Sequence, residues 1–96
     1  MVEPKTVSGK IAKHDVMLYT ISTCIWCRLL KSKLNDNNIQ YKYIDIDLVT
    51  GPEKDQIRAK LRKFQSQLAF PMMFIDEEFI SNELIDQEIA ELVQEG

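Results

Sequence analysis

The sequence predicts an α/β domain whose elements follow the order strand, helix, strand, helix, two strands and helix (βαβαββα). Residues 16–21 form a nearly continuous apolar run of strand length, and a helical pattern follows directly. Residues 40–48 alternate in the manner of a strand, and residues 72–80 hold two short apolar segments around a polar turn. With 96 residues, we expect one compact domain and no second one.

Composition excludes several classes of function. An apolar content of 45% and a charged content of 28% are typical of a soluble globular protein. No apolar run approaches the ~20 residues needed to cross a bilayer, and residues 1–13 lack the apolar core of a signal peptide. We therefore expect a cytoplasmic monomer without a membrane partner. The net charge of −3 argues against a nucleic-acid partner, which would require a basic face.

The first fourteen residues predict a flexible lead-in, and we place the domain at residues 15–96. This segment is polar, contains Pro4 and Gly9, and shows no clear period. We expect His14 to be an exposed residue at the entrance to the first strand.

The apolar run 16–21 predicts the central strand of the sheet, covered on both faces. Ser22 and Thr23 are suitable caps for the helix that follows. That helix is predicted from about Ile25 to Asp36, and it ends where asparagines tolerate the left-handed conformation.

Alternation over residues 40–48 predicts a half-buried strand. One face would carry Lys42, Ile44, Ile46 and Leu48, and the other Tyr41, Tyr43, Asp45 and Asp47. The two carboxylates resemble an acid–base or metal-binding pair. Because no histidine lies near them in the sequence, we favour solvated charges at the strand end.

The second half of the chain predicts a helix, a hairpin and a final helix. Pro52 is suited to a first helical position, and the helix after it should end before Ala69 with Ile57, Leu61 and Phe64 at helical spacing. Pro71 is expected at the entrance of a buried strand. Ser81 and Asn82 should cap the last helix, whose inward-facing residues are Ile85, Ile89, Leu92 and Val93.

The two cysteines of the chain, Cys24 and Cys27, stand three residues apart at the junction of strand and helix. Residues three apart on a helix share a face at ~5 to 6 Å, within the ~4.4 to 6.8 Å Cα range of a disulfide. At the helix start, Cys24 meets free N–H groups that lower a thiol pKa, so it is the predicted nucleophile. Cys27 shares a stripe with Leu30 and is the predicted buried resolving thiol. Arg28 adds positive charge nearby.

Other interpretations of the pair are weaker. Zinc would require four ligands, and His14 is the one histidine available besides the two sulfurs. A static disulfide across so short a span removes little chain entropy. Two cysteines buried by chance would rarely fall at this junction. Trp26, between them, is either a packing residue or an apolar contact for a substrate.

Taken in order, these motifs resemble the glutaredoxins, small members of the thioredoxin superfamily. The resemblance covers residues 16–93. Its parts are Tyr19 and Thr20 before the cysteine pair, the strand with Asp45 and Asp47, the Phe70-Pro71 pair before the hairpin, and the final helix. Residues 69–71 are similar to the Ser-Phe-Pro-type turn of an archaeal and bacterial glutaredoxin-like group.

The resemblance implies a thioredoxin fold with a four-stranded mixed sheet, helices on both faces, and a cis peptide at Phe70-Pro71 facing the cysteines. It implies a dithiol–disulfide oxidoreductase of disulfide-bearing proteins or small molecules, active in cell redox homeostasis, with no bound cofactor. Electrons would come from glutathione or from a reductase of the thioredoxin type. The implied catalytic residues are Cys24 and Cys27, and the implied substrate-binding residues are Trp26, Phe70, Pro71, Ser81 and Asn82.

This sequence departs from the family pattern at three places. Ile25 stands where the family usually has proline, and Ile21 stands where it has the lysine that contacts a glutathione carboxylate. Ser81 and Asn82 replace a Gly-Gly turn that lets glutathione approach closely. We therefore expect weak use of glutathione.

Two rival functions belong to other classes. Some glutaredoxins share an iron–sulfur cluster between two protomers through the first cysteine and glutathione, and visible absorbance of freshly purified protein would reveal one. A non-catalytic interaction domain would fail a disulfide-reduction assay. The intact cysteine pair argues against both, and a thioredoxin-like donor independent of glutathione is a further alternative.

Overall fold

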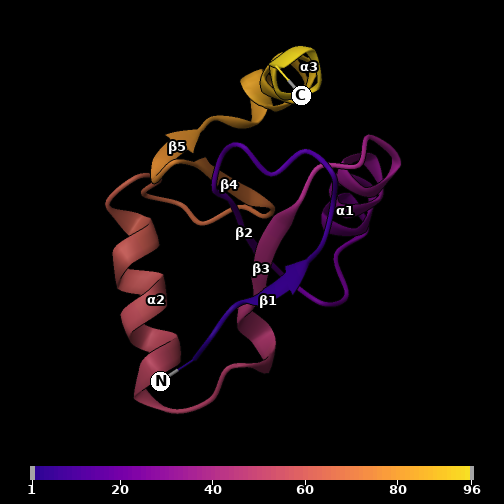
Figure 1. Ribbon diagram of the computed structural model, residues 1–96. Coiled ribbons are helices and arrows are strands. Elements are labelled where there is room, and N and C mark those ends of the chain that lie inside the picture. The colour runs from indigo at the N-terminus through magenta and orange to yellow at the C-terminus, as the bar shows by residue number, and fades with distance from the viewer. Residues whose placement is uncertain (1, 96) are drawn as a thin grey trace.

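A computed structural model describes residues 2–95 and shows a five-stranded mixed sheet with helices on both faces (Figure 1). The strands are β1 (Lys5–Val7), β2 (Val16–Thr20), β3 (Tyr41–Asp45), β4 (Met72–Ile75) and β5 (Glu78–Ile80). The helices are α1 (Ile25–Asp36), α2 (Pro52–Arg62) and α3 (Ile85–Glu95), with short 3₁₀ helices η1 (Ile46–Leu48) and η2 (Asn82–Leu84). Met1 and Gly96, which our predicted lead-in and domain include, lie outside the described residues.

Strand β2 is the centre of the sheet, as predicted. The spatial order is β1-β3-β2-β4-β5, with β2 parallel to β3 and antiparallel to β4. Leu18 packs in a core cluster with Leu30 and Ile89 beneath α1 and α3, whereas its neighbour Tyr19 packs with Leu61 of α2 on the opposite face. Since both faces of β2 are covered, its side chains are apolar nearly throughout.

The predicted four-stranded sheet is corrected to five strands, because part of the segment we took for a lead-in forms β1. This strand pairs antiparallel with β3, Lys5 opposite Tyr43 and Val7 opposite Tyr41. Further along, the N–H of Ile11 donates to the Asn38 carbonyl at 2.8 Å. The side chains of β1 are largely exposed, so its pairing depends on backbone groups and leaves no apolar period in the sequence.

Strand β3 differs from its prediction in length and in burial. It ends at Asp45, and the chain turns into η1, so Ile46 is buried while Leu48 is 65% exposed instead of sharing one face with it. The strand is not half-buried. Tyr41 belongs to the cluster under α1 and α3, and Ile44 to the cluster under α2, because β3 lies inside the sheet between β1 and β2.

The remaining elements follow the predicted order with shifted ends. Helix α1 has the predicted bounds, and Asn38 after it adopts φ 57°. Helix α2 ends at Arg62, so Phe64 lies beyond it, and its ring packs edge-on against Phe74 at 5.1 Å between centroids. In α3 the predicted inward Val93 is 39% exposed, because the buried stripe follows the helical period through Ile85, Ile89 and Leu92. Among residues 2–95, no helix combines the length and the apolar character needed to cross a membrane.

His14 is more than the exposed residue we predicted. Its Nδ1 lies 2.6 Å from Asp76 Oδ2 and its Nε2 lies 2.5 Å from Glu95 Oε2. The hydrogen bond to Asp76, and then that to Glu95, raises the pKa of His14 above its usual value. The imidazole thereby joins the entrance of β2, the β4–β5 turn and the end of α3.

The close passage of Gly9 over residues 38–40 gives a test of the N-terminal attachment. A Cβ at this position would lie 2.6 Å from both Asn38 O and Gln40 N. Gly9→Ala should therefore lower the free energy of unfolding by about 1 to 3 kcal/mol, measured by urea denaturation. Ser8→Ala, at an exposed neighbour, is the matched control and should change it by less than about 0.5 kcal/mol. Equal stability of the two variants would contradict the described contact.

Candidate active site

Cys24 begins helix α1 as its N-cap residue. Its backbone is extended (φ −84°, ψ 122°), and its Sγ accepts a hydrogen bond from the Cys27 N–H at 3.4 Å. The sulfur takes the place that a serine or aspartate oxygen usually has at a helix start. Our prediction that Ser22 and Thr23 cap the helix is therefore wrong: the loop continues one residue further, and N–H groups of the first helical turn face the Cys24 sulfur instead.

Asp47 fixes the loop that leads into the cysteine pair. Its carboxylate, in η1, accepts the Ser22 N–H at 2.9 Å and the Ser22 hydroxyl at 2.5 Å. These hydrogen bonds, the hydroxyl bond first, hold the pKa of Asp47 below its usual value. Arg28 acts on the same residue, its Nη2 donating to the Ser22 carbonyl at 3.4 Å. The turn before Cys24 is thus held from both sides.

The carboxylates of Asp45 and Asp47 accept hydrogen bonds from the end of β2 and the loop after it, so our prediction of solvated strand-end charges is wrong for both. Asp45 Oδ1 accepts the Thr20 hydroxyl at 2.5 Å and lies 3.2 Å from Lys31 Nζ. Both carboxylates meet the end of β2 because the carboxyl ends of parallel strands lie at the same edge of a sheet. That relation, two acids at the end of a strand parallel to β2, is the sequence feature that could have found them.

The two thiols are unequal and both are free. Cys27 is 1% exposed, and this burial is the main reason that its pKa is raised to about 12. At Cys24, partial burial acts to raise the pKa, but hydrogen bonds from the Cys27 thiol and from the N–H groups of Cys27 and Trp26 outweigh it and lower the pKa. A thiolate therefore forms more readily on Cys24 than on Cys27.

The Phe70-Pro71 turn, which leads directly into β4, lies against Cys24. The Cys24 thiol lies 3.9 Å from the Phe70 carbonyl, which it faces as a donor. The peptide bond between Phe70 and Pro71 is cis, as the family resemblance implied. Residues 46 positions apart in the sequence thus meet at the sulfur.

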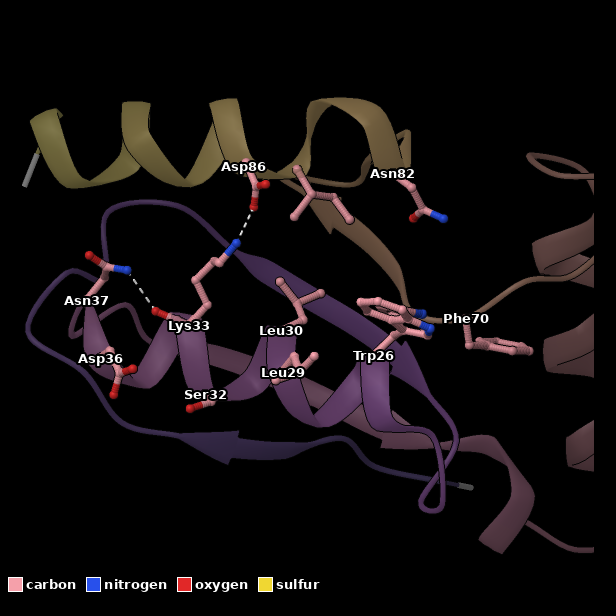
Figure 2. A pocket seen from close by; sticks show the side chains of 12 residues that line it. Trp26, Leu29, Leu30, Ser32, Lys33, Asp36, Asn37, Phe70, Asn82 and Asp86 are labelled. Atoms are coloured by element: carbon pink, nitrogen blue, oxygen red, sulfur yellow. Dashed lines mark hydrogen bonds and ion pairs between the residues drawn. The ribbon is translucent and has the colours of Figure 1, made fainter.

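A groove of about 810 Å³ runs from this turn between α1 and α3 (Figure 2). Of the predicted substrate-binding residues, Trp26, Phe70, Pro71 and Asn82 line it, whereas Ser81 is not among its described lining residues. Figure 2 shows Trp26 and Phe70 at one end, and the Lys33–Asp86 ion pair (2.5 Å) reaching across between the helices. Trp26 is 68% exposed, which favours a substrate contact over a packing role. Binding by these residues stays a prediction.

Two predicted features of the site take a different form in the structure. Ser81 begins η2 but makes no side-chain hydrogen bond as a cap, so that prediction is wrong. Ile21 is partly buried against the cluster beneath α2, and its carbonyl accepts the Cys24 N–H at 3.1 Å. Within the part of the chain that the structure describes, no three His, Cys, Asp or Glu side chains gather as metal ligands.

Comparison with known proteins shows which family has this sequence pattern and fold. The sequence model of the glutaredoxin family matches residues 16–80. The chain belongs to the glutaredoxin family. A glutaredoxin 1 of Rickettsia felis is 28% identical over 71% of this chain, and this chain spans 64% of that relative's length. A glutaredoxin 1 of Rickettsia bellii is 30% identical over 71% of this chain, and this chain spans 68% of that relative's length.

Solved glutaredoxin-type structures share the fold. Methanosarcina acetivorans methanoredoxin superimposes with a TM-score of 0.77 at 27% identity, covering 96% of this chain and 95% of its own. A glutaredoxin from Methanosarcina mazei gives a TM-score of 0.75 at 27% identity, covering 90% of this chain and 86% of its own. The thioredoxin fold implied by the motifs is confirmed, with β1 as an additional edge strand.

The difference between the thiols of this glutaredoxin predicts selective alkylation. Iodoacetamide at neutral pH should modify Cys24 much faster than Cys27, because the thiolate is the reacting species. The Cys24 rate should rise with pH and reach its plateau through a midpoint below ~8.5, the value of a free thiol. Peptide mapping by mass spectrometry at each pH measures both rates. Faster modification of Cys27 would overturn the assignment of nucleophile and resolving thiol.

Proposed function

We propose that this glutaredoxin is a dithiol–disulfide oxidoreductase in which Cys24 attacks the substrate and Cys27 resolves the intermediate. The observation that carries the proposal is the hydrogen bond from the Cys27 N–H to the Cys24 sulfur at the start of α1. That bond and the helix end stabilise a thiolate on the accessible cysteine, while the second thiol stays protonated and buried.

The reaction proceeds in two exchanges. The Cys24 thiolate attacks one sulfur of a substrate disulfide; that S–S bond breaks, and the other substrate sulfur leaves as a thiolate that takes up a proton. Cys27 then loses its proton and attacks the Cys24 sulfur. The mixed disulfide breaks, the second substrate thiol is released, and a Cys24–Cys27 disulfide remains. Two electrons have passed from the protein to the substrate.

The groove beside Cys24 supports disulfide-bearing proteins or small molecules as substrates. Neither cysteine is among its described lining residues, but its apolar end is formed by Trp26, Phe70 and Pro71, and the Phe70 carbonyl lies 3.9 Å from the Cys24 sulfur. Polar groups such as Asn82 and Asp86 lie along the α3 side. Such a surface suits an extended segment with a disulfide at one end.

Serine variants of the two cysteines test this division of roles. Cys24→Ser should abolish reduction of a protein disulfide such as that of insulin, because the attacking thiolate is gone. Cys27→Ser should retain the first exchange and accumulate mixed disulfides, which non-reducing mass spectrometry detects. The proposal fails if Cys24→Ser retains activity or if the unmodified protein reduces no disulfide.

We further propose that glutathione is a weak electron donor for this protein and that a reductase of the thioredoxin type is the alternative. Ile21 occupies the position of the family's lysine and packs among apolar side chains, so it offers no cation to a glutathione carboxylate. Asn82, where the family has glycine, places a side chain in the groove. Losing one charge-assisted hydrogen bond costs about 1.5 to 3 kcal/mol, or roughly ten- to a hundredfold in affinity.

Restoring the family residues should improve glutathione use. Ile21→Lys with Ser81→Gly and Asn82→Gly should raise glutathione-dependent turnover about tenfold or more, for the reason just given, and leave reduction by dithiothreitol nearly unchanged. Leu48→Lys adds the same charge at a 65% exposed position and should change neither rate. Assays coupled to glutathione reductase and to thioredoxin reductase measure the choice of donor. High activity of the unmodified protein with glutathione would contradict the proposal.

A further inference from the structure

The second exchange poses a chemical difficulty that the cysteine pair alone does not solve. Cys27 must become a thiolate to attack the mixed disulfide, yet it is 1% exposed and burial raises its pKa to about 12. A stabilising charge near this buried sulfur would speed the resolving step of the proposed function, on which this inference rests.

Lys31 lies one helical turn after Cys27 on the same side of α1. Its ammonium is held in a defined place: Nζ is 3.2 Å from Asp45 Oδ1 and 3.8 Å from the centre of the Tyr43 ring. The Lys31 side chain is 21% exposed and that of Asp45 15% exposed. Lys33 and Lys42 also form ion pairs, but their side chains are 48% and 36% exposed, so water screens those charges more than it screens Lys31.

The carboxylate that holds Lys31 is itself anchored. Asp45 accepts the hydroxyl of Thr20, which is fully buried, and the two residues are paired across β2 and β3. The chain Thr20–Asp45–Lys31 therefore fixes the ammonium at the end of β2, next to the loop that supports the cysteines. We propose that Lys31 is a positioning residue that stabilises the Cys27 thiolate and so accelerates the resolving step.

The groups around Cys27 show when this charge matters. Burial raises the pKa of Cys27 most, the Ile21 N–H lowers it, the Cys24 thiol and its charge raise it, and Lys31 lowers it. When Cys24 is bonded to the substrate, its charge is gone, and the Ile21 N–H and Lys31 remain as the stabilising groups. The other charged groups nearby face elsewhere: Asp45 faces Lys31 and Thr20, while Asp47 and Arg28 both contact Ser22.

A two-phase reaction separates the exchanges. Reduced protein mixed with dithiobis(nitrobenzoate) releases one aromatic thiolate when Cys24 attacks, at a rate proportional to reagent, and a second when Cys27 resolves, at a rate independent of reagent. Lys31→Met should slow the second phase and leave the first within about twofold. For each unit by which the pKa of Cys27 rises, the thiolate fraction falls tenfold and the nucleophilicity rises about threefold, so the second phase should slow about threefold per unit.

Matched variants distinguish charge from structure. Lys31→Arg keeps the charge and should retain the second phase within about twofold of the original rate, by the same argument. Lys42→Met removes another lysine ion pair, that with Asp15 at 2.9 Å. Lys42 precedes Asp45 in β3 and lies away from the end of the strand that meets the cysteine loop, so this variant should alter neither phase. Cys27→Ser should lose the second phase and thereby identify it.

A titration supplies a readout that altered folding would not imitate. In a Cys24→Ser background, the ultraviolet absorbance of the Cys27 thiolate should give a higher pKa after Lys31→Met than before it. An unchanged second phase, or an unchanged Cys27 pKa, would overturn the role of Lys31 and leave the proposed function standing. Absence of the first phase from the unmodified protein would instead contradict the proposed function.

Discussion

The structure around the site depends on one interaction, the cysteine sulfur that caps helix α1. Cys24 Sγ accepts the Cys27 N–H and thereby begins the helix, so the group that we propose as the nucleophile is also the group that satisfies the helix end. A sulfur in this position gains more as an anion than as a thiol, because the free N–H groups carry partial positive charge. Local backbone geometry thus favours the charged form of the proposed nucleophile.

The carboxyl ends of two parallel strands supply the support for that cap. Strand β2 delivers the loop with Ser22, and β3 with its following turn delivers Asp45 and Asp47. Asp47 holds the loop before Cys24, and Asp45 holds the ammonium of Lys31, which lies in α1 one turn after Cys27. Asp47 thus supports the loop that carries Cys24, and Asp45 supports the lysine that follows Cys27 by one helical turn. The site is therefore a property of the sheet edge as much as of the cysteine motif.

Elements with a strong apolar period were predictable, and elements held by backbone or polar contacts were not. The sequence was sufficient for β2, α1 and the order of the later elements, since burial repeats along them. Strand β1 was not predicted because its side chains are largely exposed and its pairing with β3 uses backbone groups. Asp45 and Asp47 were misinterpreted because alternation indicates a strand but not which neighbours cover its faces. The cysteine pair was found from its spacing, whereas the capping of α1 by the Cys24 sulfur could not be predicted without knowing the conformation of the loop.

The most direct test of the central claim is the free energy of unfolding of the fully reduced protein as a function of pH, compared with Cys24→Ala. A group whose pKa is lower in the folded state adds stability that is present above its unfolded pKa and is lost as pH falls through its folded pKa. The difference between the two proteins should therefore grow as pH rises toward ~8.5, the value of a free thiol, and then level off. A difference that does not change with pH would contradict the thiolate cap.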